Sequence, residues 1–501
     1  MGQTVNQRIA FSVIANAFRS LMAFGTGLLI ARGLGPDSYG LMMFLLGTFV
    51  AVQQLFDLGA SSAFFTFLSE RDRSWKFVSW YFFWLGLQLV ISLLCISILL
   101  PDYWIEKIWL GEDRYVISLA FLATFLQHTL WTAVLRMGES QRLTILVQSV
   151  SSCILAIHFC FIVIGFLTDW LGIRSIFLLT CVEWLIANIF VFRVMSFSEK
   201  VNAGDNLSAV FQEYWKFCLP LIPYAYISFC YEFADRWLLQ SFGGSSEQAY
   251  YAVANQISMI AGLATVSIVN IFWKEIAAAH EQKDYEVIAI YYYRFSRGLF
   301  FFCSFIAAFL VFWSSEIIEV LLGESYSAGV LTLKIMVFYP IYSAMWEVSG
   351  VLALASKRVI LHVTFGSFFK ISSIFAAYYI LSPEEGLISG LNLGSSGLAL
   401  KMVIMQFLVA NAFSYYLCRT YKMKFDWLFQ PVAIISCVSL SYFSYWVSHS
   451  SFDVTNGLLV TVSMSAIIYI LLIAFLIVIA PSLVGMDRSD LSKFKKYFSH
   501  E

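Results

Sequence analysis

The chain has 501 residues, of which 60% are hydrophobic and only 13% are charged, and its mean hydropathy is +0.77. A soluble domain averages about 45–50% apolar and about 25% charged residues, so this composition excludes the soluble globular class. The net charge of −1 provides no basic surplus, so we expect no nucleic-acid partner.

Apolar runs long enough to cross a bilayer follow one another along the whole chain, since a core of about 30 Å needs about 20 helical residues. The first run carries Arg19 and leads into the second without a cleavage site, so we expect it to stay in the mature protein. The sequence predicts an all-α polytopic membrane protein with fourteen spans, at residues 9–31, 40–68, 77–100, 115–136, 143–167, 174–195, 215–240, 249–273, 295–314, 328–355, 359–381, 396–418, 427–448 and 456–480.

The stretch ARGLGPDSYG, residues 31–40, separates the first two runs. Its glycines match part of a dinucleotide-binding fingerprint, but that fingerprint requires a preceding strand, and here a membrane helix precedes it. We therefore expect a corner, in which Gly33 and Gly35 end the first span, Pro36 turns the chain and Asp37 or Ser38 caps the second span.

Lysine and arginine are distributed unevenly between the two sets of loops. Of the 31 Lys and Arg residues, 22 fall in the termini and the loops on one side, 5 fall on the other side and 4 lie within runs. Loops rich in these residues stay cytoplasmic. We therefore expect an even number of spans and both termini in the cytoplasm, with the corner at 31–40 on the periplasmic side of a bacterial inner membrane.

A weak internal repeat relates the two halves of the chain. The corner and Tyr39 after the first span are echoed by FGGSSEQAYY, with Tyr250, after the seventh span, and Arg142 is echoed by Arg358. Six spans separate the copies, so the halves share one orientation. We expect a six-helix bundle at 1–200, a second at 201–420, and two additional spans with a basic cytoplasmic tail at 421–501.

Three stretches resemble one family of transporters. They are LLIARGLGPDSYGLMMF, LFDLGASSAFFTFLSE and LPLIPYAYISFCYEFADRWLLQSFGG, the last with a Pro-x-x-Pro entry and an Asp-Arg-Trp exit. They are similar to the Wzx-type O-antigen and polysaccharide flippases of the multidrug/oligosaccharidyl-lipid/polysaccharide (MOP) exporter superfamily. The resemblance implies two six-helix bundles around a V-shaped cavity and transport by alternating access.

The same resemblance implies the cargo and the partners. The expected cargo is an undecaprenyl-diphosphate-linked oligosaccharide, an O-antigen or other lipopolysaccharide or surface-polysaccharide unit, moved from the cytoplasmic to the periplasmic leaflet. Membrane lipids, an H⁺ or Na⁺ counter-ion, a polysaccharide polymerase and a chain-length regulator are the other partners that we expect.

Basic side chains within or beside the runs are the candidate substrate ligands. Ionisable groups at membrane depth cost about 2.5–3.5 kcal/mol each, so they usually face a cavity or a partner. Arg19 lies halfway along the first run, and its guanidinium suits a diphosphate, whereas snorkelling or a buried ion pair is the structural alternative. Three further cations are candidates for the same lining: Lys370, Lys401 and Arg236.

Acidic side chains are the candidates for ion coupling: Glu232, Asp235, Glu183 and Glu347. Glu232 and Arg236 are four residues apart, which also predicts an intrahelical salt bridge. Glu183 and Glu347 have no cation four residues away and must pair across helices, meet water or carry a proton. Prolines remove backbone donors and bend helices, so three of them are hinge candidates: Pro220, Pro223 and Pro340.

Motifs for catalysis are missing. There is no Walker A sequence, no H-E-x-x-H and no G-x-S-x-G, and the nine cysteines form no C-x-x-C pair, so we expect neither an enzyme nor a cofactor or metal. Two alternatives to the flippase remain open: a drug or metabolite cation antiporter of the same superfamily, and a membrane glycosyltransferase or polymerase.

Overall fold

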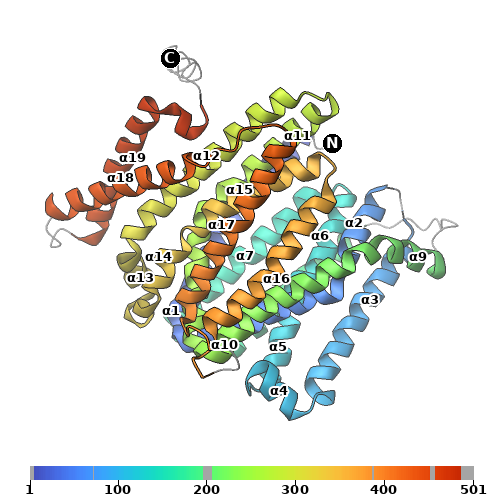
Figure 1. The fold of residues 1–501 in the computed structure, drawn as a ribbon. Helices are drawn as coiled ribbons and strands as arrows, with labels where there is room; N and C mark the ends of the chain where they lie inside the picture. The colour runs from blue at the N-terminus through green and yellow to red at the C-terminus, as the bar shows by residue number, and fades with distance from the viewer. Residues whose placement is uncertain (1–4, 71–72, 196–205, 386–388, 452–456, 487–501) are drawn as a thin grey trace. The chain divides into compact units, whose positions relative to one another are not determined.

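The fold is given by a computed structural model that describes residues 5–70, 73–195, 206–385, 389–451 and 457–486. Within these ranges every regular element is a helix (Figure 1). The chain is therefore an all-α polytopic membrane protein, as the composition predicts.

The helices belong to two compact units, the first formed by Met1–Ala249 with Ala377–Asn392, and the second by Tyr250–Ala376 with Leu393–Glu501. The first unit holds α1 (Val5–Asp57), α2 (Ala60–Glu70), α3 (Trp75–Leu94), α4 (Asp102–Trp109), α5 (Arg114–Thr124), α6 (Trp131–Ser140), α7 (Thr144–Leu167), α8 (Ile173–Val194), α9 (Leu207–Cys218) and most of α10 (Ile222–Ser258). Two π-helical segments, Cys95–Leu99 and Phe125–Leu130, extend α3 and join α5 to α6.

The second unit begins at the end of α10. It holds α11 (Leu263–Glu281), α12 (Tyr285–Phe312), α13 (Ser314–Leu322), α14 (Val330–Met336), α15 (Tyr339–Ala355), most of α16 (Val359–Leu381), α17 (Gly394–Thr420), α18 (Phe429–Ser451) and α19 (Leu458–Ile479). The end of α16 and the connection that follows it return to the first unit.

Twelve helical segments of the described chain are long and apolar enough to span a membrane. Two of them are long, Ile14–Asp57 and Ser208–Gly262, and each contains a glycine with non-helical backbone angles. Gly35 has φ 71° and ψ 172°, and Gly244 has φ 82° and ψ −176°. Each break separates two predicted spans, which reconciles twelve segments with fourteen apolar runs.

The two corners of the internal repeat pack against each other in the first unit. Ser246 donates a hydrogen bond to the Asp37 carboxylate, and a Cβ built on Gly40 would lie 1.7 Å from the carbonyl oxygen of Ser245. Gly35 is required by its positive φ, and Gly40 is required by close approach, because no side chain fits between the backbones.

Contacts along α1 fix the direction of its two halves. In the first half, Gly25 faces Phe159 and Gly33 faces Phe166, so this half runs parallel to α7. In the second half, Gly40 faces Ser245 and Gly47 faces Arg236, so this half runs antiparallel to α10. In the predicted topology, spans one and five cross the membrane in the same direction, and spans two and seven cross it in opposite directions. The contacts of α1 agree with both.

Helix ends on the predicted cytoplasmic side share a turn that holds a cation in left-handed backbone conformation. Arg142 has φ 62°, and the amide of Leu143 donates to the Gly138 carbonyl at 2.8 Å; Lys357 has φ 61°, and the amide of Arg358 donates to Ala353 at 2.8 Å. The structural counterpart of Arg142 is therefore Lys357, one residue before the Arg358 that the repeat indicated. Lys283 and Lys422 occupy the same position after α11 and α17.

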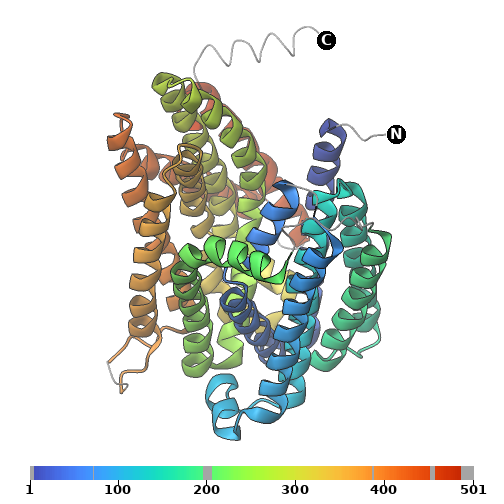
Figure 2. The ribbon, with the colours of Figure 1, turned by 90° about the vertical axis from the view of Figure 1, so that its right-hand side faces the viewer.

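Two short helices lie outside the main spans of the first unit. α4 follows α3 at the predicted periplasmic end (light blue in Figure 2), and Trp237 of α10 donates to the Lys107 carbonyl within it at 3.1 Å. α9 packs beside α2 and α3, and Arg73, whose side chain is fully buried, forms an ion pair at 2.7 Å with Glu213 of α9.

Small hydroxyl side chains join the helices of the second unit. Ser349 of α15 shares hydrogen bonds with Ser414 of α17 at 2.7 Å and with the hydroxyl of Tyr292 of α12 at 2.9 Å. Trp313 donates to Ser465 of α19, which lies 3.3 Å from Ser444 of α18. Such contacts hold helices together in lipid, where burial of apolar surface provides little drive for association.

Candidate functional site

Arg19 lies on the first half of α1 and contacts α7. Its guanidinium donates to the side-chain oxygens of Gln148 and Asn16, and its second contact with Gln148 is to the backbone oxygen at 3.5 Å. Gln148 also hydrogen bonds to Glu139 of α6, which interacts electrostatically with Arg19. Two amides therefore hold the guanidinium directly, and the carboxylate of Glu139 is reached through Gln148.

The depth of Arg19 differs from the expectation of a mid-span position. Gln148 is four residues after Thr144, where α7 begins, which is about 6 Å along the helix axis. Glu139 is next to the last residue of α6. Arg19 therefore lies about one turn inside the ends of its neighbours, because α1 continues as a helix to Val5, beyond the apolar run.

The acidic and basic residues of α10 do not form the salt bridge that their spacing predicts. Glu232 accepts a hydrogen bond from Gln54 of α1 at 2.8 Å. The guanidinium of Arg236 lies across Gly47, where a Cβ would come within 2.2 Å of Nε. Among the described residues no ion pair joins Glu232 to Arg236, and Asp235, on the same helix, is buried. Helix α1 instead supplies the partner of Glu232 and the surface against which Arg236 packs.

Glu183 is buried in α8 and pairs with His158 of α7. His158 Nδ1 lies 2.7 Å from Glu183 Oε2, and the two side chains are 13% and 6% exposed. The second carboxylate oxygen, Oε1, is buried without a hydrogen-bond partner among the described residues. The pair can hold a proton between an imidazole and a carboxylate that has one unused acceptor.

The other candidates lie in the second unit and are spread over three helices. Lys401 of α17 is 1% exposed, and Lys370 of α16 is half-buried and interacts electrostatically with His362. Glu347 of α15 is exposed. Within the described ranges, no ion pair joins any two of these three residues.

Each proline lies where a helix is interrupted. Pro220 is in a single 3-10 turn, Leu219–Leu221, between α9 and α10, and Pro223 is the second residue of α10. Pro340 opens α15 after a turn that ends α14. The missing backbone donors thus coincide with helix starts, where they cost least; motion at these points stays a prediction.

Several partners were missed by reading charges alone. Gln54 and Gln148 are amides inside apolar runs, and the cost of burying an amide is the signal that marks them. Only the packing of α7 on α8 brings His158 to Glu183. In the described part of the chain no group of three or more His, Cys, Asp or Glu side chains is placed to hold a metal ion.

Three solved structures of membrane transporters are similar to this chain in fold. The chain matches the lipid II flippase MurJ in an inward closed conformation with a TM-score of 0.70 at 16% identity, over 94% of this chain and 99% of that one. It matches an inward-facing multidrug resistance MATE family transporter of the MOP superfamily with a TM-score of 0.60 at 14% identity, over 81% and 94%. A MOP superfamily transporter from Pyrococcus furiosus Vc1 (DSM3638) matches with a TM-score of 0.55 at 12% identity, over 83% and 96%.

No curated protein matches the sequence. The family model described as "Polysaccharide biosynthesis protein" matches residues 5–273, which is more than half of the chain. Together with the fold shared with MOP superfamily transporters, this match identifies the chain as a multi-pass membrane protein that belongs to the polysaccharide biosynthesis protein family.

Proposed function

We propose that the protein is a flippase that carries a polyprenyl-diphosphate-linked oligosaccharide, of the O-antigen or a related surface-polysaccharide type, from the cytoplasmic to the periplasmic leaflet. The observation that carries the proposal is Arg19, a cation held in a membrane helix by the amides of Gln148 and Asn16. A guanidinium held in this way keeps its full charge and can bind two phosphate oxygens.

The level of Arg19 suits the start of a transport cycle. It lies about one turn inside the predicted cytoplasmic ends of α6 and α7. In the proposal, this is the level at which the diphosphate of a lipid-linked sugar enters while its prenyl chain lies in the cytoplasmic leaflet. In this proposal Arg19 binds the diphosphate on entry, and alternating access, driven by an H⁺ or Na⁺ gradient, carries it across.

A cation antiporter is the alternative within the same fold. The flippase reading is supported by the family match and by the coverage of the comparisons, because the MurJ structure spans 94% of this chain and the MATE structure 81%. A fixed arginine also repels a cationic drug, whereas it attracts a diphosphate.

Reconstitution tests the function directly. Vesicles containing the protein and a fluorescent polyprenyl-diphosphate oligosaccharide are treated with an impermeant glycosidase, and the cleaved fraction is followed with time. Without protein, only the roughly half of the lipid that faces outward can be cleaved. We expect the protein to raise the cleaved fraction above this half. No movement of any such lipid, together with efflux of cationic dyes from the same vesicles, would favour the antiporter.

Variants of Arg19 test its role. We expect Arg19→Ala to lower the initial flipping rate at least about ten-fold, the loss of one charged hydrogen-bonding partner, and Arg19→Lys to keep part of it. Arg174→Ala is the matched control, since Arg174 is exposed and pairs with Asp113 at 3.0 Å in the outer loops. The guanidinium would serve only to hold α1 against α7 if the Arg19→Ala protein moves the lipid at the wild-type rate. The same conclusion would follow if its rate falls only because its melting temperature is lower than that of the wild type.

A further inference from the structure

A cavity of about 460 Å³ lies in the second unit, where three helices end. Residues 289–300 of α12 form its floor, and the connection between α17 and α18 covers it, with Gly485 closing one side. The apolar runs predicted at 295–314, 396–418 and 427–448 all begin or end here. The cavity therefore lies at the membrane boundary on the predicted cytoplasmic side.

Its lining carries more positive than negative charge. Four cations contribute to it: Arg294, Arg297, Lys422 and Lys424. Asp426 is the one acid in the lining, and it is already engaged, because it accepts from Arg297 and from the backbone amide of Phe429 at 3.3 Å. The positive charge that remains in the lining favours an anionic ligand.

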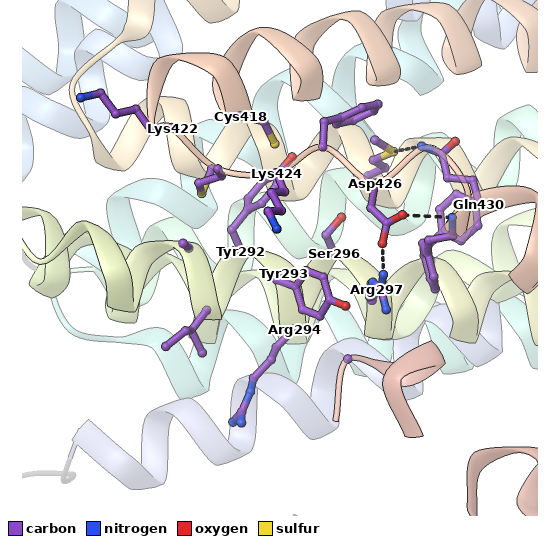
Figure 3. Close-up of a pocket in the computed structure, with 18 residues that line it drawn as sticks. Tyr292, Tyr293, Arg294, Ser296, Arg297, Cys418, Lys422, Lys424, Asp426 and Gln430 are labelled. Carbon is purple, nitrogen blue, oxygen red and sulfur yellow. Dashed lines mark hydrogen bonds and ion pairs between the residues drawn. The ribbon is translucent and has the colours of Figure 1, made fainter. Parts of the chain in front are cut away.

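The side chains are not equally placed to bind that anion. Figure 3 shows Lys424, Ser296 and Arg297 facing one space, whereas Lys422 and Arg294 point away from it. Lys424 is exposed and has no hydrogen bond or ion pair within the described ranges. The binding groups are therefore the ammonium of Lys424, the hydroxyl of Ser296 and the guanidinium of Arg297.

Arg297 is fixed in position before any ligand arrives. It donates to the Ser482 carbonyl at 2.6 Å, and its guanidinium stacks over Tyr293 at 4.1 Å and Phe429 at 4.5 Å. Its Nε is buried without a hydrogen-bond partner among the described residues. A guanidinium held in this way places its charge at a fixed position in the lining and needs no rearrangement when an anion enters.

The surroundings of the cavity are apolar and exposed, which suits a lipid. Ile290, in the lining, is 50% exposed, and Trp427 and Leu428, beside Asp426, are 55% and 77% exposed. Trp427 packs edge-on against Phe425 at 5.0 Å, in the manner of an aromatic anchor at the interface. Acyl chains can lie along these residues while a headgroup enters the cavity.

We propose that this cavity is a binding site for the phosphate headgroup of an anionic membrane lipid, with Lys424, Ser296 and Arg297 as its ligands. It differs from the Arg19 site in unit, helices and ligand residues. Its test measures lipid retention and not transport, so the result does not depend on the proposed function.

Native mass spectrometry of the full-length protein, released from nanodiscs of equal phosphatidylglycerol and phosphatidylcholine, measures the bound lipid. We expect preferential retention of phosphatidylglycerol, reduced about five-fold by Lys424→Gln. Lys422→Gln makes the same charge change in the same connection but at a side chain that points away, and we expect less than a two-fold loss. Ser296→Ala removes one hydroxyl and supplies a second variant that keeps the Arg297 packing.

Three outcomes would overturn the proposal. Equal retention of the two lipids in the wild-type protein would exclude a headgroup site. Equal losses in Lys424→Gln and Lys422→Gln would mean that surface charge alone attracts the lipid. Displacement of phosphatidylglycerol by inorganic phosphate or glycerol phosphate at similar concentrations would show a site for free phosphate, and retention that resists both would support the lipid.

Discussion

At Gly40 the second half of α1 comes so near to α10 that a methyl group has no room. A Cβ there would lie 1.7 Å from the Ser245 carbonyl oxygen, and the obstacle is backbone, which cannot rotate away. We expect Gly40→Ala to destabilise the protein by about 1–3 kcal/mol, the cost of overpacking, and to lower its melting temperature in detergent. Scanning fluorimetry of the purified variant measures this.

Gly86→Ala is the matched control for that substitution. Gly86 lies within α3, and a Cβ there meets nothing within 4 Å. The added methyl group favours helix by up to about 1 kcal/mol, so this variant should melt at or above the wild-type temperature. If both variants melt alike, the close approach of α1 and α10 is wrong.

The buried pair of His158 and Glu183 leads to a prediction about coupling. Glu183→Gln keeps a hydrogen-bonding side chain beside the imidazole and removes the carboxylate. We expect flipping to lose its response to an imposed pH gradient while the melting temperature changes little. Glu347→Gln, on the exposed face of α15, is the comparison: if it alone removes the response, the buried pair is structural.

At the scale of the element, the cations that end four helices hold a conformation that costs them energy. Lys357 has φ 61°, a left-handed geometry that disfavours any side chain with a Cβ by about 1 kcal/mol. Lys357→Gly and Lys357→Ala both remove the charge, so their difference isolates the backbone term. We expect the glycine variant to be more stable by about 1 kcal/mol.

The sign of that difference should reverse inside a helix. Lys274 is an exposed residue in the middle of α11, and there glycine is expected to be less stable than alanine by up to about 1 kcal/mol. Thermal unfolding of the four variants in one detergent gives both differences. The same sign at both positions would contradict the turn geometry after α15.

Much at this scale follows from sequence, and the residues show where it stops. Gly35 and Gly244 were readable as corners because glycine and polar residues interrupt apolar runs. The predicted Glu232–Arg236 pair failed because Glu232 accepts from Gln54, 178 residues away, and Arg236 packs across Gly47. Arg19 lies nearer the helix ends than the apolar run at 9–31 indicated. Hydropathy marks only the apolar residues, whereas helix α1 begins before that run, at Val5.

At the scale of the whole molecule, ion pairs occur in both sets of loops. On the predicted periplasmic side Arg114 forms an ion pair with Asp102 at 2.6 Å and Arg174 with Asp113 at 3.0 Å. Nearby acids thus offset these outer cations, whereas the Lys and Arg residues on the other side are more numerous. On that side, too, Arg73 pairs with Glu213 and Arg297 with Asp426. The predicted topology therefore rests on the count of Lys and Arg residues and not on their pairing.

Cysteine labelling tests the orientation. Glu106, exposed on α4, and Gln282, exposed after α11, are replaced singly by cysteine in a background without the nine native cysteines. We expect an impermeant maleimide to label Glu106→Cys in intact spheroplasts and Gln282→Cys only after permeabilisation. Labelling of both positions in intact spheroplasts, or the reverse pattern, would contradict the predicted topology.

The division into units also determines when the molecule can be completed during synthesis. The first unit includes Ala377–Asn392, and Gly40 meets Ser245 only after six further spans have been made. The second half of α1 must therefore wait in the bilayer with an uncovered glycine face while about two hundred residues are made, and the unit is complete only after residues 377–392 have followed. A chain stopped after α10 would lack part of its own N-terminal unit, which makes it a natural substrate for membrane proteases and insertion chaperones.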